Sequence, residues 1–197
     1  MPRRLHARRR VLAALTAGMA STVASVGATL FGAPGIALAK ESAARFTPWK
    51  GGATPPLVLK DRQGRTHDLA AYRGRVVLVN FWATWCEPCL EEMPSLEDLQ
   101  DRLKDRPFAL LTINMEESDA KVERFLQSTL LLEDSLVVLF DRFGTVAKQW
   151  KARMLPVSFL IGPDGRIRFT VLGAANWSAR ETVAQIDRLM PARSHRG

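Results

Sequence analysis

Residues 76–89 read VVLVNFWATWCEPC, and this stretch decides the fold. Its first seven residues, Val76 to Trp82, form a nearly continuous apolar run. A short apolar run of this kind is typical of a strand that is buried on both faces of a sheet. The run ends just before Cys86 and Cys89, which are separated by two residues. The stretch therefore predicts a buried strand that leads directly into a pair of thiols.

A helix is expected to begin at the cysteine pair. Apolar residues recur at helical spacing between residues 88 and 103, at Met93, Leu96, Leu99 and Leu103. Pro88 fits the first helical turn, where its missing N–H would have had no partner, and Pro94 is expected to kink the helix. Cys86 would lie at the helix N-terminus, where the positive end of the helix dipole stabilises a thiolate. That thiolate can attack a disulfide, and Cys89, one turn later, can resolve the mixed disulfide.

The rest of the pattern predicts an α/β fold. A short hairpin is expected over residues 57–68, ahead of the buried strand, and a second hairpin turns at Gly162-Pro163-Asp164-Gly165. The other predicted elements are strands at 109–113, 136–140, 157–161 and 166–172, and helices at 119–131, at 145–150 and from a cap at Ser178 to Met190. Strands that alternate with helices in this way imply a mixed sheet with helices on its faces.

Composition and charge are those of a globular protein. The chain has 197 residues, of which 47% are hydrophobic and 24% charged, so it can bury a core in one domain. The net charge of +8 depends on five arginines within the first ten residues, since from Lys40 onward 23 basic residues exceed 20 acidic ones by three. No basic stripe interleaved with aromatic residues is present, so no nucleic-acid partner is expected.

The first 39 residues have the pattern of an export signal. Their arginines are followed by an uncharged stretch from Val11 to Ala39 that ends in small residues. Arg8-Arg9-Arg10-Val11-Leu12 resembles a twin-arginine motif. The alternative is an uncleaved membrane anchor, because the stretch is longer than the roughly 20 residues that a spanning helix needs. In both cases the folded part would be periplasmic or on the outside face of the cytoplasmic membrane. A cytoplasmic protein is least favoured.

The remaining boundaries follow from composition. Residues 40–56 are rich in proline and glycine without a sustained period, and we expect a linker or an irregular arm there. We expect the folded domain to cover residues 57–192, with residues 193–197 as a tail.

Other uses of two cysteines fit the sequence less well. A static disulfide across two residues would close a very short loop and gain little stability. Zinc needs about four ligands, and His6, His67 and His195 are scattered without metal-binding spacing. Covalent haem attachment needs a histidine directly after the second cysteine, where this chain has Leu90. We therefore expect no metal and no cofactor other than the redox-active pair itself.

Residues 77–89, followed by Glu92, Met93 and Pro94, resemble the exported TlpA/ResA-like thiol-disulfide oxidoreductases of the thioredoxin superfamily. The resemblance spans Leu57 to Met190. It implies a thioredoxin-like fold with an added N-terminal hairpin, and a protein-disulfide reductase type of activity.

The resemblance also implies the residues that contact substrate. Pro156 would be a cis-proline that faces the cysteines, in a loop whose backbone pairs with the substrate chain. Trp85 would form part of the exposed rim beside Cys86, and Glu87, Pro88 and Leu155 are expected to complete the substrate-binding residues. The chain departs from the family at Val157 and Ser158, which replace threonines that often follow the proline.

Two polar residues bear on proton transfer. Cytoplasmic thioredoxins carry a buried aspartate in the strand before the motif, where this chain has Asn80, and an amide cannot accept a proton from the resolving cysteine. Glu92 follows Cys89 by three residues, so a helix places both on one face. By similarity, Glu92 would line the active site and transfer protons. The alternative is that Glu92 is merely a carboxylate favoured near the helix N-terminus. Glu116 and Glu117 are taken as a solvated pair without a role.

Within the resembled group most members act as reductants. The resemblance implies electrons from a membrane thiol donor and delivery to protein disulfides, in apocytochrome c or in a copper-assembly protein. Two alternatives stay open: a periplasmic disulfide oxidant or isomerase, and a Cu(I)-binding assembly module that uses both thiolates as soft ligands. A peroxide-reducing relative fits poorly, because Trp85 and the paired Cys89 do not match its lone reactive cysteine.

Overall fold

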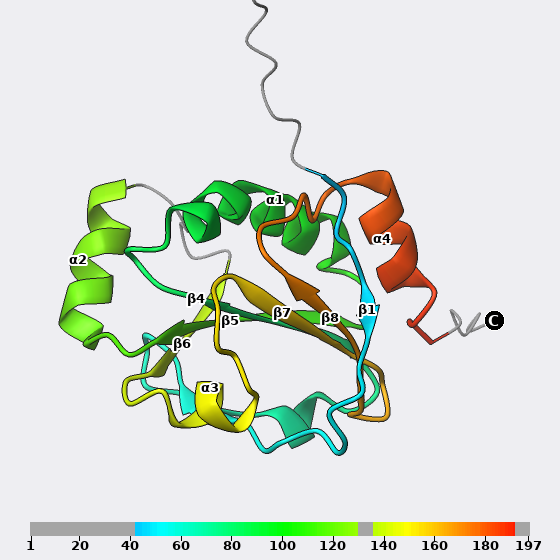
Figure 1. Cartoon of the computed structure of the whole chain (residues 1–197), viewed down its shortest axis with the longest axis horizontal. Coiled ribbons are helices and arrows are strands. Elements are labelled where there is room, and N and C mark those ends of the chain that lie inside the picture. The colour runs from blue at the N-terminus through cyan, green and yellow to red at the C-terminus, as the bar shows by residue number, and fades with distance from the viewer. Residues whose placement is uncertain (1–41, 130–135, 192–197) are drawn as a thin grey trace, which may run out of the picture. The chain divides into compact units, whose positions relative to one another are not determined.

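The structure, a computed structural model, describes residues 42–129 and 136–191 (Figure 1). The expected export signal or anchor at 1–39, the tail at 193–197 and the last two residues of the helix predicted at 119–131 lie outside these ranges. The elements are β1 (Thr47–Pro48), β2 (Val58–Lys60), β3 (Thr66–Asp68), the 3₁₀ helix η1 (Leu69–Tyr72), β4 (Val76–Trp82), α1 (Glu87–Leu103), β5 (Phe108–Met115), α2 (Asp119–Thr129), β6 (Val137–Asp141), α3 (Thr145–Gln149), β7 (Val157–Ile161), β8 (Ile167–Leu172) and α4 (Arg180–Asp187). None of the helices in the described ranges has the length and apolarity that a membrane-spanning helix needs.

A mixed six-stranded sheet forms the centre, in the order β1-β8-β7-β4-β5-β6. Strands β4, β5 and β6 are parallel, so their carboxyl ends meet at one edge of the sheet. Strand β7 pairs antiparallel with β4, and β8 pairs antiparallel with β7. The predicted mixed sheet flanked by helices is confirmed, and so is the thioredoxin-like fold class.

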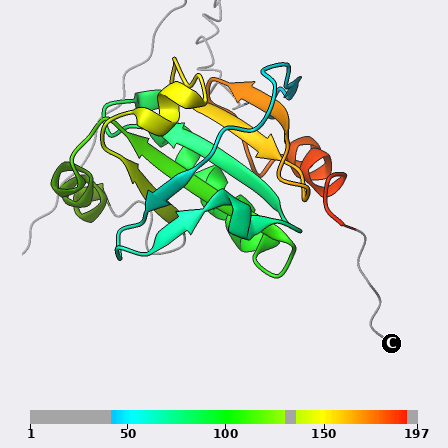
Figure 2. The ribbon, with the colours of Figure 1, turned by 90° about the horizontal axis from the view of Figure 1, so that it is seen from below.

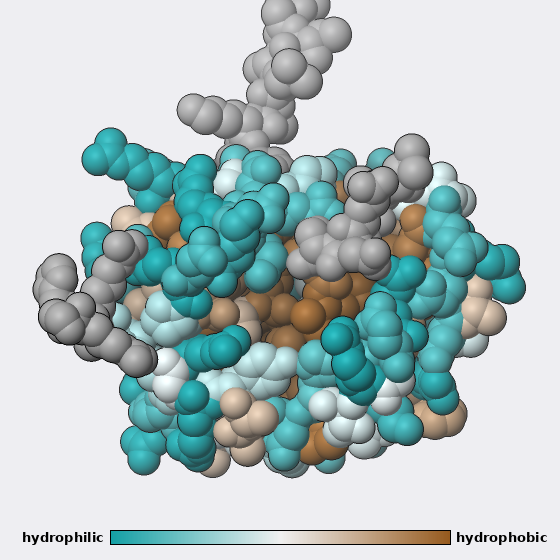
Figure 3. All heavy atoms as spheres, turned by 180° about the vertical axis from the view of Figure 1, so that it is seen from behind, coloured by the Kyte–Doolittle hydropathy of each residue, from teal (hydrophilic) through white to brown (hydrophobic). Residues whose placement is uncertain are grey.

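Strand β4 is buried over its full length because both faces of the sheet are covered. Its side chains alternate between two hydrophobic clusters, as the two-residue period of a strand requires. Leu78 and Trp82 pack with residues of α1, α2 and α4 on one face, whereas Val79 and Phe81 pack with residues of α3 and η1 on the other. Figure 2 shows α3 and the β2–β3 hairpin in front of this second face. Figure 3 shows the molecule from behind, with hydrophobic residues in the middle of that view and hydrophilic residues around them.

The predicted hairpin before β4 forms a separate two-stranded sheet, β2 with β3. Asp61, in the turn, is 4% exposed. Its carboxylate accepts hydrogen bonds from Arg65 Nε at 2.7 Å and from the backbone N–H groups of Gln63 and Arg65, and it lies 2.9 Å from His67 Nε2. Burial raises the pKa of Asp61, but the bonds to His67 and Arg65 outweigh it and lower this pKa from 3.8 to about 2. The ionised carboxylate therefore fixes the shape of the turn.

The stretch expected to be a linker or irregular arm carries structure in its described part. Strand β1 pairs with β8, and Phe46 and Trp49 pack against the two hydrophobic clusters. The Ser42 carbonyl accepts a hydrogen bond from the Asn176 N–H, and Ala44 N–H donates to Thr182 Oγ1. A two-residue strand is too short to show a period in the sequence.

The helix predicted to begin at a Ser178 cap differs from the structure. Helix α4 begins at Arg180 after Ala179, which offers no side-chain cap, and it ends at Asp187 rather than near Met190. Ser178 is occupied elsewhere, since its hydroxyl and its N–H both donate to Asn176 Oδ1. The capping prediction was wrong because the side chain bonds within its own loop instead.

Candidate active site at the cysteine pair

Cys86 and Cys89 form a disulfide between the end of β4 and the start of α1. Cys86 is the N-cap residue of α1 and has an extended backbone, with φ −91° and ψ 92°. The Cys89 N–H donates to the Cys86 carbonyl at 3.0 Å, which closes the first turn. The predicted placement of the pair, at a strand-to-helix junction with Pro88 in the first turn, is confirmed. The helix runs through Pro94 to Leu103.

The two sulfur-bearing residues differ in exposure. Cys86 is 5% exposed and Cys89 is fully buried. Trp85, directly before the pair, is 66% exposed, and Glu87 and Pro88 are also exposed. Among the described residues, Cys86 is therefore the more accessible cysteine of the pair, and the exposed Trp85 and the first turn of α1 lie next to it.

The Leu155–Pro156 peptide bond is cis, which confirms the expected conformation. Pro156 directly precedes β7, whose first residue, Val157, pairs with Phe81 of β4. This register places Pro156 beside the carboxyl end of β4, at the edge from which the cysteine loop departs. Pro156 is buried and its carbonyl accepts the Gly173 N–H at 2.9 Å, while Leu155 is half-buried. The structure thus brings Leu155 and Pro156 to the same edge as the cysteine pair.

Glu92 is fully buried in α1, one turn after Cys89. Its carboxylate accepts hydrogen bonds from Asn80 Nδ2 at 2.7 Å, Trp177 Nε1 at 3.0 Å and Ala175 N–H at 3.1 Å. A buried carboxylate requires such partners, because desolvation without them is costly. The alternative of a simple carboxylate near the helix N-terminus does not describe these contacts, since they tie α1 to β4 and to the loop before α4.

Asn80 takes part in this arrangement as a donor. Its amide nitrogen bonds both Glu92 Oε1 and, at 2.9 Å, Ser158 Oγ of β7. The amide that replaces the aspartate of cytoplasmic thioredoxins therefore orients a carboxylate that comes from the helix. Ser158, one of the two departures from the family pattern, supplies an oxygen for the second amide hydrogen. Trp177 and Ala175 were not foreseen, because nothing in their own sequence context marks them as partners of Glu92.

Glu117 corrects the expectation of a solvated pair. Glu116 is exposed, but Glu117 is only 5% exposed. The Glu117 carboxylate accepts hydrogen bonds from Thr84 N–H at 2.7 Å, Thr84 Oγ1 at 2.6 Å and Asn114 Nδ2 at 2.8 Å, and it pairs with Lys121 Nζ at 2.6 Å. Burial raises the pKa of Glu117, but the bonds from Lys121, Thr84 and Asn114 outweigh it and lower this pKa below its ordinary value.

The backbone conformation explains why Glu116 is exposed while its neighbour Glu117 is buried. Glu116 has a positive φ of 60°, and its N–H donates to the Asp141 carbonyl at 3.0 Å. A left-handed residue at this point turns the chain, so that the next side chain points back toward Thr84. Glu117 thereby holds the backbone two residues before Cys86. A positive φ at a non-glycine residue cannot be read from this sequence, which is why the residue was missed.

Exposed apolar side chains gather at the disulfide edge. The large exposed hydrophobic residues of the described ranges are Val58, Trp85, Phe143, Met154 and Leu172. Trp85, Phe143, Met154 and Leu172 lie in loops or strand ends at the edge where β4, β5 and β6 end, where β7 begins and where β8 ends, and Val58 of β2 lines a hollow together with Phe143. Large apolar side chains left exposed at one edge make that edge a candidate surface for contact with another protein. Within the same ranges no group of three or more His, Cys, Asp or Glu residues is placed to hold a metal ion.

Comparison with known proteins agrees with this geometry. The model of the Redoxin family matches residues 45–189. The thiol-disulfide oxidoreductase ResA of Geobacillus thermodenitrificans is 34% identical over 123 residues, which cover 62% of this chain and 69% of that protein. ResA of Bacillus subtilis is 30% identical over 151 residues, 77% of this chain and 79% of that protein. The crystal structure of StoA from Bacillus subtilis superposes with a TM-score of 0.58 at 24% identity, over 69% of this chain and 99% of StoA, and shows the shared fold.

Proposed function

The chain belongs to the Redoxin family and is a ResA-like thiol-disulfide oxidoreductase, and we propose that Cys86 and Cys89 are its reacting pair. The observation that carries the proposal is the Cys86–Cys89 disulfide at the N-terminus of α1, on an edge lined with exposed apolar side chains. The helix N-terminus stabilises a thiolate, and the apolar edge suits a protein substrate.

The reaction proceeds through a mixed disulfide. In the reduced enzyme, the Cys86 thiolate attacks one sulfur of a substrate disulfide, an S–S bond forms to that sulfur, and the other substrate sulfur leaves as a thiolate. Cys89 then loses its proton and attacks Cys86 Sγ, which releases the second substrate thiolate. Two electrons pass to the substrate, and the enzyme is left with the Cys86–Cys89 disulfide. Cys86 is assigned the attacking role because it is the more exposed of the two.

The rim residues hold the substrate chain. Trp85, Glu87 and Pro88 are exposed on the side of Cys86 from which a substrate would approach. Leu155 and Pro156 lie at the start of β7, beside the end of β4, where an extended substrate segment could align along the loop. We assign these five residues to substrate binding.

Glu92 is assigned to proton transfer at Cys89. It lies on the same face of α1 three residues later, and its carboxylate is held by three N–H donors. Replacement by glutamine keeps the size of the side chain but removes its capacity to accept a proton. Glu92→Gln should shift the pH profile of disulfide exchange, and an unchanged profile would remove Glu92 from the mechanism.

We assign the physiological direction to reduction, in a compartment outside the cytoplasm. This rests on the family likeness and on the export pattern of residues 1–39. Partners would be proteins with accessible disulfides, such as apocytochrome c or a copper-assembly protein, and a membrane thiol donor would restore the dithiol. The reaction itself needs no added cofactor, because the cysteine pair carries the electrons.

The decisive experiment is the equilibrium reduction potential of the Cys86–Cys89 couple, titrated against glutathione or dithiothreitol, together with an insulin-reduction assay. A potential near or below the roughly −270 mV of thioredoxin, with turnover of insulin, supports the reductant. A potential near the roughly −120 mV of strong periplasmic oxidants would make the protein a disulfide donor instead. Stoichiometric Cu(I) retention by the reduced protein without turnover would favour the copper module.

A further inference from the structure

A hollow of about 840 Å³ lies at the edge of the sheet opposite the cysteine pair. It is lined by the segment that follows β1, by the β7–β8 turn and by Arg73, three residues before β4. Cys86 follows the other end of β4, and seven residues of strand span about 20 Å. The hollow is therefore separate from the redox site and leaves it accessible.

Positive charge dominates the lining. Four cationic side chains, Lys50, Arg73, Arg166 and Arg168, share the hollow with one carboxylate, Asp164. Asp164 Oδ2 accepts from Arg168 at 2.7 Å and lies 3.9 Å from Arg166 Nε, while Arg73 donates to the Asp164 carbonyl at 2.7 Å. One carboxylate cannot neutralise three guanidinium groups, and the described residues provide no ion-pair partner for Lys50.

The backbone around the hollow is held in place by hydrogen bonds between its segments. Trp49 N–H donates to the Arg168 carbonyl, Ile167 N–H donates to Thr54 Oγ1, and Gly74 N–H donates to the Pro163 carbonyl. The Trp49 indole donates to the Gly52 carbonyl, which closes the loop after β1. The positive groups are thus presented by a framework that does not have to form when a ligand binds.

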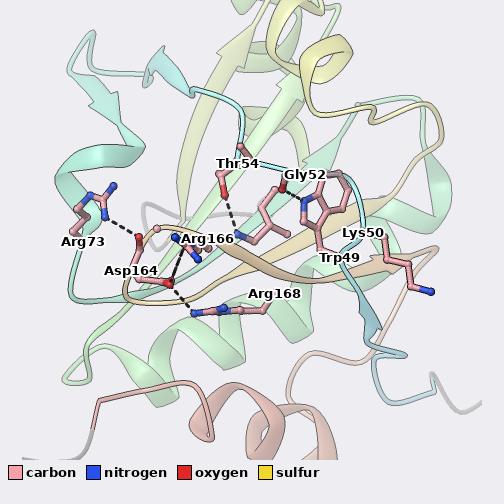
Figure 4. A pocket seen from close by; sticks show the side chains of 11 residues that line it. Trp49, Lys50, Gly52, Thr54, Arg73, Asp164, Arg166 and Arg168 are labelled. Carbon is pink, nitrogen blue, oxygen red and sulfur yellow. Dashed lines mark hydrogen bonds and ion pairs between the residues drawn. The ribbon is translucent and has the colours of Figure 1, made fainter.

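The cations occupy two places in the hollow, with three arginines beside Asp164 and Lys50 apart from them. Figure 4 shows Arg73, Arg166 and Arg168 gathered around Asp164, with Lys50 on the far side of the Trp49 ring. A small anion bound at the arginines would leave Lys50, beyond the Trp49 ring, without a partner. A chain that carries several carboxylates could pair with the arginines at one end of the hollow and with Lys50 at the other. The methylene groups of its acidic side chains would then lie across the Trp49 indole.

We propose that this hollow binds an acidic polypeptide segment of a partner protein. Guanidinium groups pair with carboxylates through two parallel hydrogen bonds, so an Asp- or Glu-rich segment matches the three arginines. A bilayer surface fits less well, because it is flat on this scale and the lining is concave. Since the site lies at the opposite edge from the disulfide, the partner can stay bound while Cys86 and Cys89 exchange with a second protein.

The test compares two double variants of the full-length oxidised protein. Lys50→Glu with Arg166→Glu reverses a charge at each end of the hollow, and the Arg166 side chain is 79% exposed, so neither change disturbs packing. Arg124→Glu with Lys148→Glu makes the same change of net charge on α2 and α3, outside the hollow. This control is needed because the arginines among the first ten residues also attract acidic chains. Binding of a fluorescent decaglutamate peptide is measured by anisotropy, with vesicles of anionic phosphatidylglycerol and inorganic phosphate as separate arms.

We expect the hollow variant to bind the peptide at least tenfold more weakly than the control variant, and the difference to shrink as salt is raised. Insulin reduction should be the same in both variants. Equal peptide affinity in the two variants would overturn the proposal. So would a charge-reversal effect seen only with vesicles, or only with inorganic phosphate, because each would point to a different ligand. None of these outcomes depends on the direction of the redox reaction.

Discussion

Replacing Asp61 by asparagine should lower the free energy of unfolding by about 2 kcal/mol at pH 7. Asparagine has the shape of the protonated aspartic acid and, like it, carries no charge. The variant therefore loses the stabilisation that the ionised carboxylate gives to the folded state. The carboxylate pairs with Arg65 Nε at 2.7 Å and lies 2.9 Å from His67 Nε2, inside a turn where it is 4% exposed.

The magnitude follows from the pKa of Asp61, which is 3.8 ordinarily and about 2 in the fold. One pKa unit corresponds to about 1.4 kcal/mol, so the difference amounts to about 2 kcal/mol. The pKa is lowered, so the unfolded chain binds the proton more tightly. The stabilisation is therefore complete above about pH 4 and is lost as the pH falls toward 2.

Urea denaturation at pH 7 and at steps between pH 5 and pH 2 measures the effect. The unfolding free energies of the parent and of Asp61→Asn should differ by about 2 kcal/mol at pH 7 and converge at the acid end. Asp98→Asn is the matched control, because Asp98 is exposed on α1 and makes no hydrogen bond or ion pair within the described residues. A constant difference at all pH values, or a loss as large in the control, would refute the reasoning.

Three further predictions concern the active site. Glu117→Gln should lower the free energy of unfolding by about 1–3 kcal/mol and slow disulfide exchange, because an amide N–H₂ would face the Thr84 donor. Glu116→Gln is the control and should change little, because Glu116 is the exposed neighbour. Equal effects of the two variants on stability and on exchange rate would argue against the anchoring role of Glu117. Cys89→Ser should abolish turnover and accumulate a mixed disulfide with substrate, detectable by mass spectrometry, and multiple turnovers would contradict its resolving role. Trp85→Ala should raise KM for insulin several-fold. The free energy of unfolding should change by less than about 0.5 kcal/mol, because Trp85 is 66% exposed. An unchanged KM would remove Trp85 from the substrate surface.

Sequence reasoning succeeds here where the signal is local. The apolar run at 76–82 and the helical spacing from Met93 to Leu103 each reflect a period that a single element imposes on its own residues. The turn at 162–165 is equally local, since its proline and glycines specify its backbone. These features locate the strands, the helix and the position of the cysteine pair.

The contacts that complete the site are not local, which is why they escaped prediction. Glu92 and Trp177 are 85 residues apart, and Thr84 and Glu117 are 33 apart. A glutamate after a strand, such as Glu117, looks solvated in sequence because charged side chains usually are, and the spacing of Glu92 from Cys89 does not show which groups its carboxylate bonds. Their burial follows from how the loops around the sheet edge are brought together, and that depends on the whole fold.

The contact between the start of the described chain and the loop before α4 bears on where a shortened protein should begin. Asn176, whose N–H is bonded by the Ser42 carbonyl, sits between Ala175 and Trp177, the two residues of that loop that bind the Glu92 carboxylate. Ala44 N–H is anchored nearby, to Thr182 of α4. A fragment cut after Ala44 would keep both cysteines and every strand from β1 onward, yet it would remove the outer support of the loop. Two fragments with the same catalytic residues could then differ in the pH dependence of their chemistry, according to a boundary set more than forty residues before the first cysteine.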